Sequence, residues 1–308
     1  MPPTSALPNS PRSTSSQSKD ASTCGRIRAR PGSGVVSGAL FPSTYSEAAA
    51  ALEAHPSAVV VAGGTDVMVA VNDGSRQVDR WISLRRVQHA DHFEVDGDSV
   101  LVGAGTTFEQ ILGPRGAALP ALAEAARTVG GPQIRAAATL GGNLATASPA
   151  GDSLPALACY DTEIQIVGAT HDRWVPLTDF LIGPGQTLLG PGEVIAALRL
   201  SSTSGAQHFA KLGTRNAMVI SVCSLAGRLD ADAGIARLAI GSASATVRRA
   251  VDAETLLLDG APPDDVGAAV AEASSPIDDH RASAAYRRHA LAVLGSRITR
   301  WLRNSDHG

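Results

Sequence analysis

The chain has 308 residues, of which 44% are apolar and 18% charged, a composition that supports about two folded domains with hydrophobic cores. A net charge of −3 offers no basic field for a phosphate backbone, and 4% aromatic residues are too few for a stacking groove. No apolar run reaches the roughly 18 residues of a membrane span, and the N-terminus lacks a secretory apolar stretch. We therefore expect a cytoplasmic protein with neither nucleic acid nor membrane as a partner.

The cysteines and histidines are scattered. The three cysteines, Cys24, Cys159 and Cys223, are far apart and odd in number, which argues against a disulfide framework and against a CxxC site. No carboxylate or cysteine cluster joins the eight histidines into a ligand set. We expect reduced thiols and no metal site in this chain.

Composition divides the chain into three parts. Residues 1–34 are rich in Ser, Pro and Gly without a hydrophobic period, which predicts a disordered N-terminal tail. Its prolines argue against the amphipathic helix of an organelle transit peptide, so a plain extension is expected. The remainder is predicted to form one domain at 35–204 and a second at 205–308, where the sequence pattern changes.

The first domain shows short strands alternating with helices. Residues 44–47 have the pattern of a capping box, which predicts a helix that stops before Pro56. The apolar run 58–61 ends in two glycines, which indicates a buried strand followed by a tight turn. Further strands are expected at 81–84, 100–102 and 163–167, and further helices at 108–112, 120–129 and 154–160. This alternation indicates an α+β layout.

The second domain has strands first and helices afterwards. Strand character is found at 208–212, 219–229 and 235–245, and helical periodicity at 247–258, 263–273 and 282–302. Strands followed by amphipathic helices predict a small three-stranded sheet with helices packed against it.

Two glycine-rich segments carry the candidate chemistry. Residues 62–66 read AGGTD, and residues 139–143 read TLGGN, followed by SPAGD at 148–152. Neither segment fits the G-x-G-x-x-G or G-x-x-x-x-G-K-[ST] nucleotide fingerprints. Adjacent glycines let consecutive amides face a ligand without a Cβ in the way, and a threonine adds a hydroxyl. The pair is suited to clasping the two phosphates of a dinucleotide; the alternative is two tight turns without a ligand.

Lysine is rare in this chain. Only two of the 26 basic residues are lysines: Lys19, in the tail, and Lys211. Because an ammonium and a guanidinium differ in shape and hydrogen-bond geometry, a lone lysine among arginines suggests a role that arginine cannot fill. The alternative is an ordinary surface lysine.

The order of these motifs identifies a family. AGGTD, GAGTT, TLGGN, SPAGD, PGE and KLGTR, followed by RASAAYRR at 281–288, resemble the FAD-binding subunit of molybdenum hydroxylases, the xanthine dehydrogenase and carbon monoxide dehydrogenase flavoproteins. The resemblance covers residues 38–305. It implies an α+β protein with a two-lobed FAD-binding domain of the vanillyl-alcohol-oxidase or p-cresol-methylhydroxylase type, followed by a smaller α/β domain.

The resemblance also implies which residues contact FAD. The first cofactor segment comprises Val60, Val61, Ala62, Gly63, Gly64, Thr65, Asp66 and Val67. The second comprises Thr139, Leu140, Gly141, Gly142 and Asn143. Distant relatives that attach FAD covalently use a histidine beside the first segment, and this chain has none there, so noncovalent binding is implied.

Four further positions match family contacts with the cofactor. The Asp152 carboxylate is suited to accept hydrogen bonds from hydroxyl or amine groups, and Ile195 makes its contact through the backbone. Val129 stands where some relatives place an aromatic ring over the flavin, a ring that valine lacks. Lys211 is the catalytic candidate, because an ammonium beside the flavin stabilises the negative charge of its reduced form.

In this family the molybdenum cofactor and two [2Fe–2S] clusters lie in partner chains or domains. Three cysteines fit that division, since one plant-type cluster needs four. The resemblance implies electron flow from [2Fe–2S] to FAD and on to NAD⁺, with oxygen or another acceptor as the alternative. Residues 216–218, Asn-Ala-Met, resemble xanthine-type members more than carbon-monoxide-type members, so xanthine is the expected substrate of the complex. A carbon monoxide dehydrogenase-like subunit, or a subunit of another aromatic-heterocycle or aldehyde hydroxylase, is the alternative. A stand-alone flavin oxidoreductase of this fold would need a His–Tyr–Glu grouping after residue 205, which is missing, and a binding or assembly module is the remaining alternative.

Overall fold

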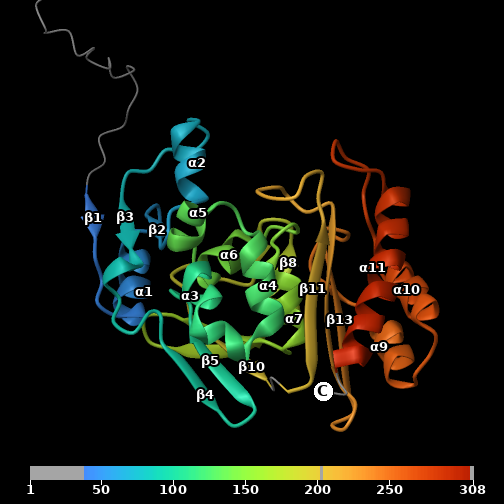
Figure 1. Cartoon of the computed structure of the whole chain (residues 1–308). Helices are drawn as coiled ribbons and strands as arrows, with labels where there is room; N and C mark the ends of the chain where they lie inside the picture. The colour runs from blue at the N-terminus through green and yellow to red at the C-terminus, as the bar shows by residue number, and fades with distance from the viewer. Residues whose placement is uncertain (1–37, 202–203, 306–308) are drawn as a thin grey trace, which may run out of the picture. The chain divides into compact units, whose positions relative to one another are not determined.

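The computed structural model describes residues 38–201 and 204–305 (Figure 1). The predicted tail at 1–34 lies outside the described residues. Among the described helices, none combines the length and apolar character that crossing a membrane requires. The predicted domain boundary at 204/205 falls in the connection between strands β10 (Val194–Ser201) and β11 (Ala206–Leu212).

A small parallel sheet begins the described chain. Its strand order is β1 (Ala39–Leu40), β3 (Trp81–Ser83) and β2 (Val59–Val61), with helix α1 (Tyr45–Ala54) between β1 and β2 in the sequence. The helix begins as predicted, because the Thr44 hydroxyl accepts the amide of Glu47 at 3.1 Å. The reciprocal half of the capping box is absent: the Glu47 carboxylate binds the amide of Ser43 instead.

An antiparallel sheet of five strands follows, with β10 at its centre. Its order is β4 (Phe93–Asp96), β5 (Ser99–Gly103), β10, β6 (Glu163–Val167) and β7 (Asp172–Pro176). One hydrophobic core joins this sheet to four helices: α3 (Phe108–Leu112), α4 (Pro120–Thr128), α6 (Leu140–Thr146) and α7 (Ser153–Cys159). Helix α5 (Pro132–Ala137) contacts α3 and has no buried residue. Shorter elements complete this part: α2 (Val67–Asn72), η1 (Leu84–Arg86), η2 (Pro114–Ala118), α8 (Leu177–Phe180), β8 (Leu181–Gly183) and β9 (Gln186–Thr187).

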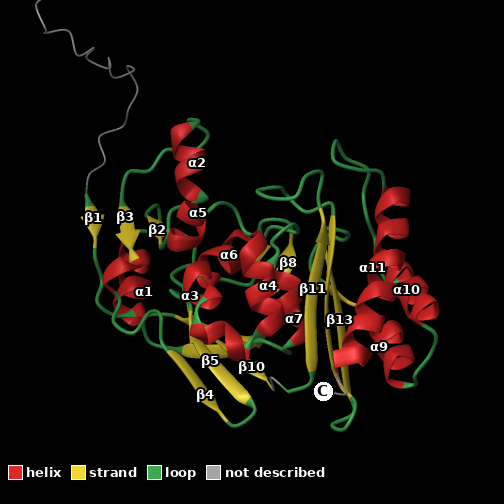
Figure 2. Cartoon of the chain, viewed as in Figure 1, coloured by secondary structure: helices red, strands yellow, loops and turns green. Residues whose placement is uncertain are grey.

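The C-terminal part is a four-stranded antiparallel sheet between two layers of helices (Figure 2). Its order is β11, β12 (Cys223–Asp230), β13 (Ile235–Gly241) and β14 (Arg248–Arg249). One face packs on α9 (Val251–Leu258), α10 (Pro263–Glu272) and α11 (Ala284–Ser305). The other face contacts α4 and α7, so the sheet is buried on both sides.

The prediction of a three-stranded C-terminal sheet is wrong by one strand. Residues 248–249, predicted as the start of a helix, pair with β13, and the helix begins only at Val251. A two-residue strand has no periodicity to detect, and tertiary contacts hold it extended: the Arg249 guanidinium binds Asp161 and Glu254. Strand β13 also ends before the predicted residue 245, because Ser242 takes a φ of 61° and donates its amide to Pro149.

Candidate cofactor-binding site

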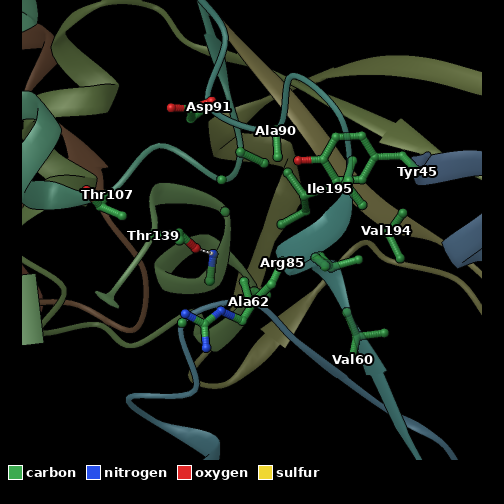
Figure 3. A pocket seen from close by; sticks show the side chains of 18 of the residues that line it. Tyr45, Val60, Ala62, Arg85, Ala90, Asp91, Thr107, Thr139, Val194 and Ile195 are labelled. Atoms are coloured by element: carbon green, nitrogen blue, oxygen red, sulfur yellow. Dashed lines mark hydrogen bonds between the residues drawn. The ribbon is translucent and has the colours of Figure 1, made fainter. Parts of the chain in front are cut away.

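Two cavities, of about 560 and 690 Å³, meet beside the end of β2. Both volumes lie in the usual range of ligand pockets. The smaller cavity, which we call the β10 cavity, is lined by Tyr45 and by Ile195 of β10 (Figure 3). The larger one, which we call the α4 cavity, is lined by Val129, at the end of α4, and by Asp152. Their shared lining consists of Val60, Ala62, Gly63, Thr139, Gly142 and Ala145. The two cavities therefore adjoin as one cleft, and residues of both glycine segments belong to the lining that they share.

The fold brings nearly all the predicted cofactor residues to this cleft. The predicted residues that line it are Val60, Val61, Ala62, Gly63, Gly64, Thr65, Asp66, Val67, Val129, Thr139, Gly141, Gly142, Asn143, Asp152 and Ile195. Two predicted residues do not line it. Leu140 is fully buried in the hydrophobic core, and Lys211 lies behind Asp152.

The first glycine segment, residues 62–66, presents unused amides. Within the described residues, the backbone N–H groups of residues 63–66 donate to no protein acceptor. Gly64 has a φ of +74°, which favours glycine. Gly63 is packed so closely on α5 that a Cβ would overlap the carbonyl of Ala137. A run of four free amides in such a turn is an arrangement that binds anions.

The second glycine segment is the start of a helix, which was not predicted from the sequence. Residues 140–146 form α6, which Thr139 caps by accepting the amide of Gly142 at 3.0 Å. The amide of Leu140 donates to Thr106 and that of Gly141 to Ala104, so the first turn has no free donor for a phosphate. Gly141 serves close packing instead, since a Cβ there would lie 2.6 Å from the Cβ of Ala104.

Asp152 provides an unsatisfied acceptor in the α4 cavity. Its Oδ2 accepts hydrogen bonds from Lys211 Nζ at 2.6 Å and from the Thr128 hydroxyl at 2.9 Å. Its Oδ1 is buried and has no partner among the described residues. Burial raises the pKa of Asp152, and the nearby Lys211 ammonium opposes that rise. A buried oxygen without a donor is costly, and Asp152 belongs to the lining of this cavity, so the residue suits a ligand that brings an O–H or N–H group.

The position of Lys211 explains why this residue is not an arginine. Its ammonium donates to three acceptors: the Asp152 carboxylate, the Thr128 carbonyl at 3.3 Å and the Val219 carbonyl at 3.0 Å. An ammonium has three hydrogens that point in separate directions, whereas a guanidinium is a flat fork. Lys211 thus joins α4, the turn before α7 and the loop before β12, and Asp152 compensates its charge.

The β10 cavity contains functional residues that the sequence reasoning missed. Glu193, in the PGE motif, accepts hydrogen bonds from Arg173, from His171 at 3.1 Å and from the amide of Gly190 at 2.6 Å. The Arg173 contact, more than any other, lowers the pKa of Glu193 to about 2. These bonds hold the start of β10, which carries Ile195 into the cavity. Burial raises the pKa of Tyr45, which lies beside Val194 and Ile195 in this cavity (Figure 3), to about 12.

Comparison with known proteins agrees with this geometry. The family model described as the FAD binding domain in molybdopterin dehydrogenase matches residues 35–201. The model of the CO dehydrogenase flavoprotein C-terminal domain matches residues 208–302. Together the two models span nearly the whole described chain.

Individual relatives have differing substrates in their names. A putative xanthine dehydrogenase FAD-binding subunit of Escherichia coli (strain K12) is 29% identical over 270 residues, covering 83% of this chain and 92% of the relative. A nicotinate dehydrogenase FAD-subunit of Eubacterium barkeri is 32% identical over 205 residues, covering 63% of this chain and 69% of the relative. The solved structure of Cu,Mo-CO dehydrogenase has the same fold, with a TM-score of 0.81 at 23% identity, covering 87% of this chain and 98% of that one.

Proposed function

This chain belongs to the FAD-binding medium subunits of molybdenum hydroxylases, and from that premise we propose that its cleft holds one FAD noncovalently. The observation that carries the proposal is a pair of unused groups in one cleft: the free amides of residues 63–66 and the buried Oδ1 of Asp152. Free donors suit the pyrophosphate, and the free acceptor suits an O–H or N–H group of the flavin half.

Each cavity is proposed to take one half of the cofactor. The α4 cavity, walled by Val129 and Asp152, takes the flavin half, and the β10 cavity takes the adenosine half, with the backbone of Ile195 beside it. The pyrophosphate then lies where both cavities share Gly63 and Gly142. Bound FAD supplies a group that takes up and gives out electrons one or two at a time.

The protein's own contribution is positioning and exclusion of water. Lys211 holds the Asp152 carboxylate through a 2.6 Å contact with Oδ2, which leaves Oδ1 buried without a partner among the described residues. We propose that this ion pair, rather than the ammonium alone, sets the electrostatic environment of the flavin. Val129 contributes an apolar side chain to the wall of the α4 cavity, and this side chain has no polar group that could bind water.

We propose that the subunit receives electrons from [2Fe–2S] clusters of a small subunit and passes them to NAD⁺. The molybdenum cofactor is assigned to a large subunit. In support, the whole sequence has three cysteines, fewer than the four of a plant-type cluster, and Cys159 and Cys223 are both buried. A medium chain of carbon monoxide dehydrogenase from Hydrogenophaga pseudoflava is 30% identical over 163 residues.

Xanthine is the proposed substrate of the complete complex. It is favoured because the FAD-binding subunits with xanthine dehydrogenase in their names combine 29% identity with alignment over 92% of their own length, whereas the glyceraldehyde dehydrogenase and nicotine 6-hydroxylase relatives are 26% identical. Nicotinate is the second candidate, because the nicotinate dehydrogenase relative has the higher identity, 32%, over a shorter stretch. Reconstituting the chain with its large and small subunits and comparing xanthine and nicotinate oxidation distinguishes them.

An absorption spectrum tests the cofactor assignment. The purified full chain should show a flavin spectrum with about one FAD per chain, and acid precipitation should release the FAD because no covalent link is expected. A chain that purifies colourless and binds no added FAD would contradict the assignment. Xanthine hydroxylation by the rigorously purified single chain would contradict its role as one subunit of a complex.

A further inference from the structure

Arg85 lies beside the first glycine segment and has no part in the function proposed above. It belongs to η1, directly after β3. Strands β2 and β3 are parallel, with Val61 opposite Ser83, so both end at the same edge of their sheet. Residues 62–66 follow one strand there and Arg85 follows the other. Carboxyl ends of neighbouring parallel strands are where such sheets bind ligands.

The Arg85 side chain extends into the β10 cavity. Figure 3 shows it reaching toward Ala62, at the start of the first glycine segment, and both residues line this cavity. The cavity that Arg85 lines therefore includes the start of the segment whose amides are unused.

Arg85 is also the uncompensated charge of this cavity. The other charged side chains in its described lining are Asp91 and Glu193. Asp91 accepts from Gln110 at 2.6 Å, with Arg115 at 3.7 Å, and Glu193 is bound by Arg173. Arg85 makes no ion pair or hydrogen bond with any described residue. A cavity with one free cation, whose lining also includes Gly63 at the start of the free-amide run, is complementary to an anion with several oxygens.

The adjacent arginine is oriented differently. Arg86 places its guanidinium over the ring of Phe41, 4.7 Å from the ring centroid, and does not line either cavity. The two neighbours have the same charge and lie on the same short helix, so Arg86 is a matched control for Arg85.

We propose that Arg85 binds the pyrophosphate of the dinucleotide beside the first glycine segment, and so makes the cleft prefer a dinucleotide to a flavin without adenylate. This inference rests on the proposed function, and it adds a binding residue that the family motifs do not include. A guanidinium presents paired N–H groups to phosphate oxygens, and because Arg85 is exposed to solvent, salt screens the interaction.

The test compares Arg85→Gln, Arg86→Gln and the wild type as full chains freed of flavin. Titration calorimetry with FAD, ADP, adenosine and riboflavin measures each affinity at about 50 mM and about 500 mM salt, which changes the screening length severalfold. Arg85→Gln should bind FAD and ADP about tenfold more weakly at low salt, a typical loss for one charge-assisted hydrogen bond. Its affinities for riboflavin and adenosine should match the wild type, the difference should shrink at high salt, and Arg86→Gln should change none of them.

Several outcomes would overturn the inference. Equal FAD affinity in Arg85→Gln and the wild type would do so while leaving the proposed function intact. A loss for adenosine as large as that for ADP would mean that Arg85 contacts the nucleoside rather than the phosphates. A wild-type chain that binds no FAD would instead refute the proposed function, and the role of Arg85 with it. Thermal unfolding of the flavin-free variants verifies that all three chains are folded.

Discussion

The first glycine segment and the start of α6 have similar sequences and opposite hydrogen-bond states. Both have two adjacent glycines and a threonine, yet the amides of residues 63–66 are free, whereas those of Leu140, Gly141 and Gly142 are bound within the protein. The free groups are available to a ligand, and the bound groups hold the fold. We therefore expect substitutions at bound groups to lower stability without FAD, and substitutions at free groups to lower FAD affinity.

The largest effect is expected at Lys211, whose three hydrogen bonds are all internal. Lys211→Met leaves the Asp152 carboxylate buried without its cation, which typically costs about 3–5 kcal/mol. Chemical denaturation of the flavin-free chain measures this. Combining Lys211→Met with Asp152→Asn should restore much of the lost stability, because the double variant has no unpaired buried charge. If Lys211→Met alone were as stable as the wild type, the Lys211–Asp152 ion pair would not stabilise the fold.

Gly141→Ala tests the bound amides of α6. The added Cβ would lie 2.6 Å from the Cβ of Ala104, so the helix must shift, at a typical cost of about 1–3 kcal/mol. The melting temperature of the flavin-free chain should fall accordingly. If stability were unchanged and only FAD affinity fell, the start of α6 would serve the cofactor rather than the fold, contrary to the contrast drawn above.

Gly64→Ala tests the free amides, with Gly97→Ala as its control. Both glycines have positive φ, +74° and +55°, and at neither would a Cβ meet a close contact. Each substitution should cost about 1 kcal/mol of stability. Only Gly64→Ala should weaken FAD binding, by about tenfold, since it misaligns donors to a charged group. Equal FAD affinities of the two variants, measured by flavin fluorescence, would remove the first segment from the site.

The smallest effect concerns acid stability through Glu193. Its folded pKa, about 2, lies below the ordinary value of about 4.3, so its stabilising contribution is complete above that value and disappears as the pH falls toward 2. Glu193→Gln should therefore be less stable than the wild type at pH 7, and its melting temperature should fall less between about pH 5 and pH 3. If the melting temperatures of the two chains fell by the same amount over that pH range, Glu193 would not be an acid-sensitive support of β10.

The sequence predicted the parts of the site that depend on local chemistry. An apolar run before two glycines was enough to locate β2 and the first segment, both of which the structure contains. Helix α6 was missed because two glycines disfavour a helix, and its first turn is stabilised by the carbonyls of Thr106 and Ala104, which are distant in sequence. Arg85 and Arg86 cannot be told apart in sequence, because the direction of each side chain depends on strand pairing.

Amide hydrogen exchange tests the central claim most directly. Without FAD, the amides of residues 63–66 should exchange rapidly, and those of Leu140, Gly141 and Gly142 should be protected. Saturating FAD should slow exchange in the first segment strongly and change α6 little. Protection of residues 63–66 before FAD is added, or no change after saturation, would contradict the claim that the first segment reserves its amides for the cofactor.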